Sequence, residues 1–407
     1  MSAYLWIIDL SYSNRLHHGG LLRYFNLSRE LVAQGHTVTF AVFYEEEREK
    51  GMAWLDSLQA QGVFTRHCEI VIDRTLRAWN RRAMFLLPFR LHHLAIRPFI
   101  AAARGAITAI LQRYPADAVI VSSRRFIFVA HDVPVKPCIG DFSDSETLRV
   151  WREFKYELRR GRYGAAVRRC PDLFAYFFLE FHTCRKYAVN ILVSPVDKHL
   201  FDRIGIPEKN VCLTNGVRTG VDPSAIEKLP QQVIFSGAMN FPPNFEGAIW
   251  FLDYVFPLVK EALPGVNLLI AGAQPDQKLV ARAGPDIQVS GFVADLNKTI
   301  AESDLYVAPL VTGCGFKNKV IEAIANGTYV IGTTFAAECL EPEIRNLITV
   351  RDEPREMAAA IIDYFSNPAP YLQKLTRLME IVRDRFSWSA KAAELAGLTE
   401  MNRTVRD

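Results

Sequence analysis

Short apolar runs alternate with amphipathic segments along most of the chain. Near the start, the run from Tyr4 to Ile8 predicts a buried strand, and apolar positions at helical spacing predict a helix between residues 21 and 32. Gly35 then stands where a helix end favours a left-handed residue, and the β-branched run TVTFAVF follows as a second strand. This order of strand, helix and strand is the unit from which parallel sheets are built.

The same alternation continues in two regions of the chain. Apolar runs at 118–122, 190–194 and 210–214 extend the first sheet, and residues 215–232 are rich in turn residues and predict a linker. Beyond the linker, strands are expected at VIFSG, VNLLIAG, IQVSG, LYVAPL and TYVIGT, with helices at 244–262, near 275–283 and near 295–302. The pattern predicts an α/β protein with two doubly wound domains whose strand ends face a shared cleft.

Length and composition agree with a two-domain globular protein. The chain has 407 residues, of which 50% are hydrophobic and 23% charged, and this balance excludes a disordered protein. No apolar run is long enough to span a membrane, and the early Asp9 argues against a signal peptide. Seven widely spaced cysteines without a Cys-x-x-Cys pair support neither a disulfide framework nor a zinc site, so a cytoplasmic location is expected.

Two insertions in the first half combine arginine with aromatic residues. Residues 74–104 and 151–186 both mix arginines with Trp, Phe and Leu, a pattern typical of a helix that lies in a lipid headgroup layer. The sequence therefore predicts an anionic membrane surface as a partner, with the protein peripheral on the inner face. The alternative is a pair of ordinary helices with apolar core faces and solvated arginines. No nucleic-acid-binding module accompanies the charge, so nucleic acid is not expected.

The run PLVTGCGFKNKVIEAIANGTYVIGT carries the main candidate chemistry. Gly313 and Gly315 stand at a predicted strand-to-helix turn, where free backbone amides and a helix N-terminus favour an anion. Lys317 and Lys319 add positive charge, and Glu322, one turn into the helix, is placed to accept hydrogen bonds from a ribose. The alternative is a glycine-containing turn with solvated lysines and a surface glutamate.

This run resembles the nucleotide-binding segment of the retaining glycosyltransferases of family four, which have the two-domain GT-B fold. VIFSGAMNFPPNFEGAIWFL resembles the first strand and helix of the family's second domain, and GGLLRYFNLSRELVAQGHTVTF resembles its N-terminal glycine loop and first helix. FSWSAKAAELAGL resembles the closing helix that returns to the first domain. The resemblance is nearest to bacterial sugar transferases linked to surface polysaccharide assembly. It implies an acceptor-binding domain at 1–218, a nucleotide-sugar-binding domain at 233–386 and a closing helix at 387–407.

The resemblance implies a glycosyltransferase of the hexosyltransferase type. Such an enzyme would transfer a sugar from a nucleoside diphosphate to a hydroxyl of a glycan or lipid-linked saccharide, with retention and without a metal or other cofactor. It places Asp141, His18 and Lys317 as catalytic candidates. The implied donor-binding residues are Gly19, Gly20, Gly237, Phe292, Val293, Gly313, Cys314, Gly315, Phe316, Lys317, Asn318, Lys319 and Glu322.

The chain also departs from the family pattern. Cys314 stands where the first of two spaced glutamates is usual, and Tyr329 stands where proline is usual. Basic residues that many members carry after the first strand of the second domain are missing, so Lys317 is expected to take over the diphosphate. Two alternatives therefore stay open, a sugar-nucleotide epimerase on the same fold and a donor-binding protein without catalysis.

Overall fold

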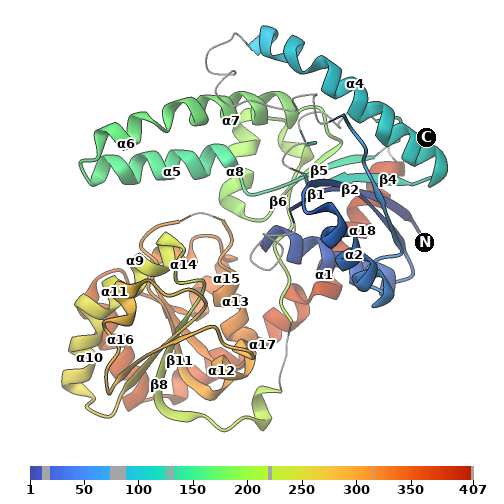
Figure 1. The fold of residues 1–407 in the computed structure, drawn as a ribbon. Helices are drawn as coiled ribbons and strands as arrows, with labels where there is room; N and C mark the ends of the chain where they lie inside the picture. Colours follow the sequence, from blue (N-terminus) through green and yellow to red (C-terminus); the bar gives the residue numbers. More distant parts are fainter. Residues whose placement is uncertain are drawn as a thin grey trace. The chain divides into compact units, whose positions relative to one another are not determined.

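In the computed structural model, the chain folds into two compact units (Figure 1). The first unit contains Met1–Asn215 together with Trp388–Asp407, and the second contains Gly216–Ser387. The structure describes residues 1–11, 19–73, 89–123, 126–127, 133–135, 137–218, 222–313 and 315–404.

The first unit is built on a parallel sheet. Within the described residues its strand order is β3-β2-β1-β4-β5-β6-β7, so the order reverses between β1 and β4. The strands are β1 (Ala3–Ser11), β2 (Thr37–Glu46), β3 (Arg66–Glu69), β4 (Ala118–Val121), β5 (Cys138–Ser143), β6 (Val189–Leu192) and β7 (Asn210–Cys212). Trp6, Ile7 and Ile8 of β1 are all fully buried. Burial on both faces of the sheet explains why this strand is a continuous apolar run and does not alternate.

Helices cover this sheet and also form an extension from it. They are α1 (Gly19–Ala33), α2 (Arg48–Ala60), α4 (Phe89–Arg113), α5 (Glu146–Arg159), α6 (Tyr163–Val167), α7 (Cys170–Thr183), α8 (Pro195–Ile204), the short η3 (Pro207–Lys209) and α18 (Trp388–Thr404). Ala392, Leu395 and Ala396 of α18 belong to the same apolar core as β1 and α1. Gln34 after α1 also donates a hydrogen bond to the Ser389 carbonyl at 2.9 Å. The segment that follows the second unit is thus part of the first unit's core.

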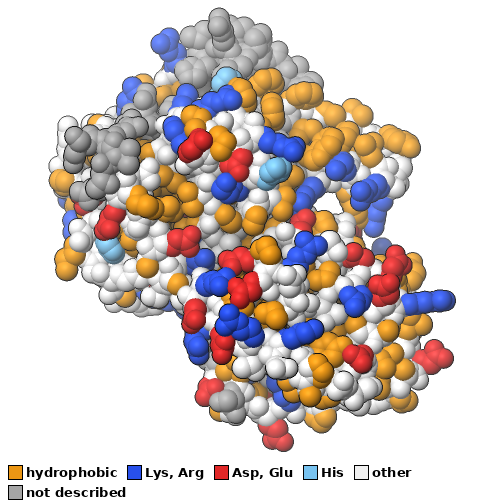
Figure 2. All heavy atoms as spheres, turned by 180° about the vertical axis from the view of Figure 1, so that it is seen from behind, with side chains coloured by type: hydrophobic (Ala, Val, Ile, Leu, Met, Phe, Trp, Pro, Cys, Tyr) orange, Lys and Arg blue, Asp and Glu red, His pale blue; other side chains and the backbone are white. Residues whose placement is uncertain are grey.

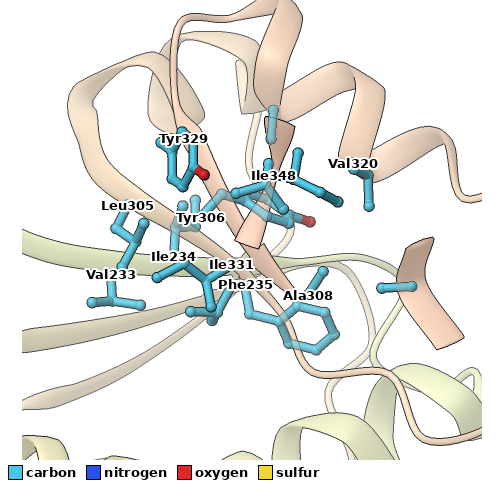
Figure 3. Packing of buried hydrophobic residues seen from close by; sticks show 14 of the residues in the cluster. Val233, Ile234, Phe235, Leu305, Tyr306, Ala308, Val320, Tyr329, Ile331 and Ile348 are labelled. Carbon is cyan, nitrogen blue, oxygen red and sulfur yellow. The ribbon is translucent and has the colours of Figure 1, made fainter. Parts of the chain in front are cut away.

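The second unit contains a separate parallel sheet. Its order among the described residues is β10-β9-β8-β11-β12-β13, with the reversal between β8 and β11. The strands are β8 (Leu229–Ser236), β9 (Asn267–Ala271), β10 (Ile287–Gly291), β11 (Ser303–Ala308), β12 (Tyr329–Gly332) and β13 (Thr349–Val350). Figure 3 shows how Phe235, Tyr306 and Ile331 from three of these strands pack in the core. Both units therefore have the parallel α/β architecture that the sequence predicts.

The helices of the second unit connect these strands. They are the short η4 (Pro223–Ala225), α9 (Pro242–Trp250), the π-helical η5 (Phe251–Val255), α10 (Phe256–Ala262), α11 (Gln277–Val280), α12 (Leu296–Glu302), α13 (Asn318–Ala325), α14 (Thr334–Ala337), α15 (Pro342–Leu347), α16 (Pro354–Ser366) and α17 (Ala369–Phe386). The helix expected at 244–262 is present but contains the π segment. Pro257 explains the irregularity, because it has no N–H to donate to a carbonyl one turn earlier.

Tyr329 has a structural role at the position where the family usually has proline. Its hydroxyl donates to the Leu347 carbonyl at 2.8 Å and lies 3.0 Å from Thr349 Oγ1. Its ring stacks on Tyr364 and meets Tyr371 edge to face. The tyrosine thus joins β12 to the segment around β13 and to the outer helices.

Glu180 is a buried carboxylate at the base of the α5–α7 region. This fully buried carboxylate accepts hydrogen bonds from Ser145 Oγ at 2.8 Å and from the Glu146 amide at 2.7 Å, which are the first groups of α5. Burial is the main cause that raises the pKa of Glu180 to about 7. The folded state therefore holds this proton more tightly than the unfolded chain does.

We expect Glu180 to lower stability as the pH rises. The contribution is most favourable below the pKa of an unfolded glutamate and declines until the pH reaches about 7. In the unaltered protein, Glu180 should lower the free energy of unfolding by about 2–3 kcal/mol between pH 4.5 and pH 7.5, and Glu180→Gln should remove this decrease. Urea denaturation of both proteins at several pH values measures the difference, and parallel pH profiles would contradict the expectation.

Candidate functional site

Two glycines bring the ends of neighbouring strands in the second unit close together. Gly237 follows β8 and Gly272 follows β9, with φ angles of 149° and 157° that L side chains rarely adopt. Gly237 donates to the Ala271 carbonyl and Gly272 donates to the Gly291 carbonyl, both at 2.9 Å. A Cβ on Gly272 would lie 1.7 Å from the Gly237 oxygen. The backbone is thus packed tightly at the carboxyl edge of the sheet, beside the strand-order reversal where α/β proteins bind ligands.

Lys319 places an amine at this reversal point. It is the second residue of α13, and its Nζ donates to the Ser236 carbonyl at 2.9 Å and to Asn244 Oδ1 at 2.5 Å. The Phe235 ring lies 4.8 Å from the same nitrogen. A Cβ on Gly237 would approach that nitrogen to 2.7 Å, so glycine is needed there. Burial is the main cause that lowers the pKa of Lys319 to about 7, so the amine loses its proton more easily than an exposed lysine does.

Glu322 lies one turn further along α13, on the same side of the helix as Lys319. In the described part of the chain its carboxylate receives no hydrogen bond and forms no ion pair within 4 Å. Burial raises the pKa of Glu322, and the charge of Lys319 acts in the opposite direction. Lys319 thus provides an amine, and Glu322 provides a carboxylate that is open, meaning that it has no hydrogen-bond partner among the described residues. Both lie at one end of the sheet.

Lys317 is held by its own loop. Its buried Nζ donates to the Gly315 carbonyl at 2.7 Å and lies 3.8 Å from Glu338 Oε1. The Phe335 ring is 5.2 Å from the same nitrogen. Phe316 stacks on Phe386 with the ring planes 12° apart. These contacts indicate that Lys317 orders the turn before α13.

A cavity of about 340 Å³ lies beside this loop in the second unit. Its walls come from the segments that follow β11 and β12 and from their neighbours. The lining residues are Trp250, Leu310, Val311, Thr333, Thr334, Phe335, Glu338 and Asp352. Phe335 and Glu338 are also neighbours of Lys317, so the cavity and the loop share a wall.

Asp141 of the first unit is the centre of a buried network. Its Oδ2 lies 3.4 Å from Arg23 Nε and accepts from Ser122 Oγ at 3.4 Å, while its Oδ1 accepts from the Ser143 amide at 3.1 Å. Arg23 Nη1 donates in turn to the Thr214 carbonyl. Asp141 is 3% exposed and lies within β5. These contacts describe a structural ion pair, and they place the carboxylate away from solvent.

The remaining sequence candidates fall into three groups. Gly19 and Gly20 begin α1, and Asn318 begins α13. Phe292 is 80% exposed directly after β10, whereas Val293 packs against the core of the second unit. The candidates outside the described residues are His18, Cys314 and the basic segment 74–88.

Sequence reasoning missed several partners of the site. Asn244 binds Lys319, but it lies in the region where the sequence showed only that the usual basic residues are missing. No sequence motif indicated that Phe335 and Glu338 would lie beside Lys317. The signal for Asn244 was available, because it lies in the first helix turn after β8, beside the carboxyl ends of the strands.

Among the described residues, no group of three or more His, Cys, Asp or Glu side chains is arranged to hold a metal ion. Within the same part of the chain, no helix combines the length and apolar character needed to cross a membrane.

Comparison with known proteins finds similarity to glycosyl transferases in the second unit. Residues 230–367 match the model of the glycosyl transferases group 1 family. The chain is 25% identical over 228 residues to a 44.6 kDa protein of the cps region of Klebsiella pneumoniae, covering 52% of this chain and 56% of that protein. It is 29% identical over 181 residues to phosphatidyl-myo-inositol mannosyltransferase of Mycobacterium leprae, covering 42% and 47%. The chain thus spans about half the length of these curated relatives.

Solved structures establish the fold over nearly the whole chain. HepE of Anabaena, crystallised with UDP, superposes with a TM-score of 0.66 at 14% sequence identity, covering 98% of this chain and all of that one. The protein has the GT-B fold, so the fold predicted from the sequence is confirmed.

Proposed function

We propose that the protein is a glycosyltransferase that moves a sugar from a nucleoside diphosphate to a hydroxyl of a glycan or lipid-linked saccharide. The observation that carries the proposal is the Lys319 amine beside the open Glu322 carboxylate at the strand-order reversal. The family match over 230–367 and the UDP bound to a protein of the same fold support it. The mannosyltransferase of M. leprae, named for a phosphatidylinositol acceptor, supports the lipid-linked class.

Lys319 is the residue to which we assign the diphosphate, in place of Lys317. Among the described residues, the acceptors of the Lys319 nitrogen are neutral, namely Ser236 O and Asn244 Oδ1, so its charge is available to an anion. Lys317 is already close to the Glu338 carboxylate. In its ammonium form Lys319 would stabilise the negative charge of the leaving diphosphate, as a fixed cation in a site with little water does. This supports a metal-independent reaction, and retention is part of the same proposal by resemblance to the family.

Glu322 and the loop after β10 would bind the nucleoside. The open carboxylate is suited to accept hydrogen bonds from the two ribose hydroxyls. Phe292 and Val293 follow the end of β10, where backbone groups and an exposed ring are available to a base. The geometry fits a ribonucleotide and does not select the base.

The proposal is tested first by binding and then by transfer. Calorimetric titration with UDP, GDP, dTDP and their hexose conjugates is expected to identify one tight nucleotide, and incubation of that donor with lipid-linked and free saccharides is expected to yield a glycoside. Binding without transfer or hydrolysis would instead favour the non-catalytic donor-binding protein that Cys314 suggests. Conversion of the donor sugar without an acceptor would favour an epimerase. Failure of every nucleotide to bind would overturn the proposal.

Glu322→Gln is expected to weaken UDP binding by roughly tenfold, because the neutral amide loses charge-assisted hydrogen bonds to the ribose. The affinity for inorganic pyrophosphate, which has no ribose, should stay unchanged. Calorimetry with both ligands measures the two effects. Glu302→Gln on α12 is the matched control, since Glu302 pairs with Lys298 just before the start of β11, whereas the site lies at the carboxyl ends of the strands. An equal loss for pyrophosphate and UDP would contradict the ribose assignment.

A further inference from the structure

Helices α5, α6 and α7 form a helical hairpin in the first unit, here called the arm (residues 146–183). Figure 1 shows α5 and α7 side by side, with the short α6 at the end of the pair that is distant from the sheet. Ala175 and Leu179 of α7 and Val150 of α5 are buried, so each long helix has an inner face. The arm is therefore a packed element that presents a second, outer surface.

The outer surface of the arm carries unusually exposed apolar side chains. At its end, Tyr163 is 68% exposed and Val167 is 65% exposed, and their spacing of four places them on one side of α6. Phe174, Phe177 and Phe178 form a similar exposed row on α7. The other large exposed apolar residues of the arm are Trp151 and Leu158. Burying apolar side chains of this kind against another surface is favourable.

Positive charge surrounds these side chains. Residues 155–169 contain one lysine and five arginines against a single glutamate. Arg162 pairs with Glu157 and Arg169 with Glu153, which leaves a clear excess of positive charge at the end of the arm. Figure 2 shows hydrophobic and basic side chains intermingled on the part of the molecule that the arm occupies.

We propose that the arm docks on an anionic lipid bilayer, with the end around α6 in the headgroup layer. Arginines alternating with exposed Tyr, Val and Phe match a surface that is negative outside and apolar beneath. Nucleic acid would use the arginines but would gain little from the aliphatic Val167 and Leu158. A second copy of the arm would bring like charges together. The proposal does not depend on the donor site of the second unit.

The test uses the full chain and sedimentation with vesicles. Vesicles of phosphatidylcholine with about 30% phosphatidylglycerol are expected to bind the protein, and vesicles of phosphatidylcholine alone are expected to bind it at least roughly tenfold less. Arg159→Glu with Arg160→Glu and Arg168→Glu should lower the affinity for anionic vesicles roughly a hundredfold. Tyr163→Ser with Val167→Ser should lower it roughly tenfold and make the remaining binding fully salt-sensitive.

Matched controls carry the same substitutions on exposed residues of the second unit. Arg345→Glu with Arg355→Glu and Arg383→Glu repeats the change of charge, and Tyr254→Ser with Val280→Ser repeats the apolar change. Both controls should bind anionic vesicles like the unaltered protein. Circular dichroism and thermal unfolding of each variant separate a lost surface from a lost fold.

Four results would overturn the proposal. The first two are that the unaltered protein does not bind anionic vesicles, or that the arm variants and the control variants bind them equally. The third is that the arm substitutions abolish binding to transfer RNA but leave binding to vesicles unchanged. The fourth is that the unaltered protein is a dimer in sedimentation equilibrium and only the arm variants dissociate it. Because donor binding is read separately by calorimetry, failure of vesicle binding leaves the proposed function intact.

Discussion

Replacing Lys319 with methionine is expected to reduce the affinity for UDP by about 10- to 100-fold. The substitution keeps most of the side-chain volume but removes the cation that we assign to the diphosphate. A hydrogen bond to a charged group contributes about 1.5–3 kcal/mol, and each 1.4 kcal/mol is a factor of about ten in affinity. The fold should be retained, because methionine leaves no buried charge at a position where burial already disfavours one. Calorimetry with UDP measures the loss.

The same residue predicts a pH dependence of binding. The pKa of Lys319 in the free protein is about 7, because the amine is buried. A bound diphosphate favours the ammonium form, so it raises this pKa and binding takes up a proton above pH 7. UDP affinity should therefore fall as the pH increases from 7 to 9 in the unaltered protein and stay constant in Lys319→Met. Titrations in buffers with different ionisation enthalpies count the protons taken up.

Two comparisons make the Lys319 prediction decisive. Lys298→Met alters an exposed lysine of α12 in the same unit and should leave UDP binding unchanged. Lys317→Met should have a smaller effect than Lys319→Met, since Lys317 is held by Gly315 and Glu338. If Lys317→Met abolished binding while Lys319→Met had no effect, the diphosphate would belong to Lys317, as the sequence alone suggests.

Gly272→Ala is expected to destabilise the second unit by about 3–5 kcal/mol. The new methyl group would lie 1.7 Å from the Gly237 oxygen, which is backbone and cannot move aside without separating β8 from β9. The φ angle of 157° adds strain for any L side chain. Because Gly237 also adjoins Lys319, the protein that remains folded should bind UDP poorly. Urea denaturation and calorimetry measure the two losses.

Gly284→Ala is the matched control for Gly272→Ala. Gly284 lies in the same unit, but no atom of the described residues stands within 4 Å of an added Cβ there. We expect a change within about 0.5 kcal/mol, as for most surface substitutions. Equal stability of the two variants would show that the backbone of β8 and β9 tolerates a side chain, and it would contradict the close packing at this edge.

The apolar runs were sufficient to predict most of the sheets. VIFSG, VNLLIAG and LYVAPL correspond to β8, β9 and β11, because parallel strands covered on both faces are continuous apolar runs. The edge strand β3 lacks this signature: it is the polar run from Arg66 to Glu69, and its pairing with β2 was not predicted. The linker prediction for 215–232 was too long, since β8 already begins at Leu229 with exposed residues.

The site was predictable only where its residues are close in sequence. The spacing of Lys319 and Glu322 places them on one helix face, and local pattern shows this. The partners of Lys319 are far away along the chain, at Ser236 and Asn244, and only the folded sheet brings them together. The same limit explains Asp141, whose neighbour Arg23 lies more than a hundred residues earlier. A local sequence pattern does not reveal contacts between residues that are this far apart in the chain.

The participation of α18 in the first core has a consequence for biosynthesis. Ala392 and Leu395 leave the ribosome only after the whole second unit has been translated, so the N-terminal core stays open on one side until then. A nascent chain released before residue 388 would contain a complete second unit and an unfinished first one. Its uncovered apolar surface would bind chaperones and proteases. The first unit can therefore fold completely only after residues 388–404 have been translated.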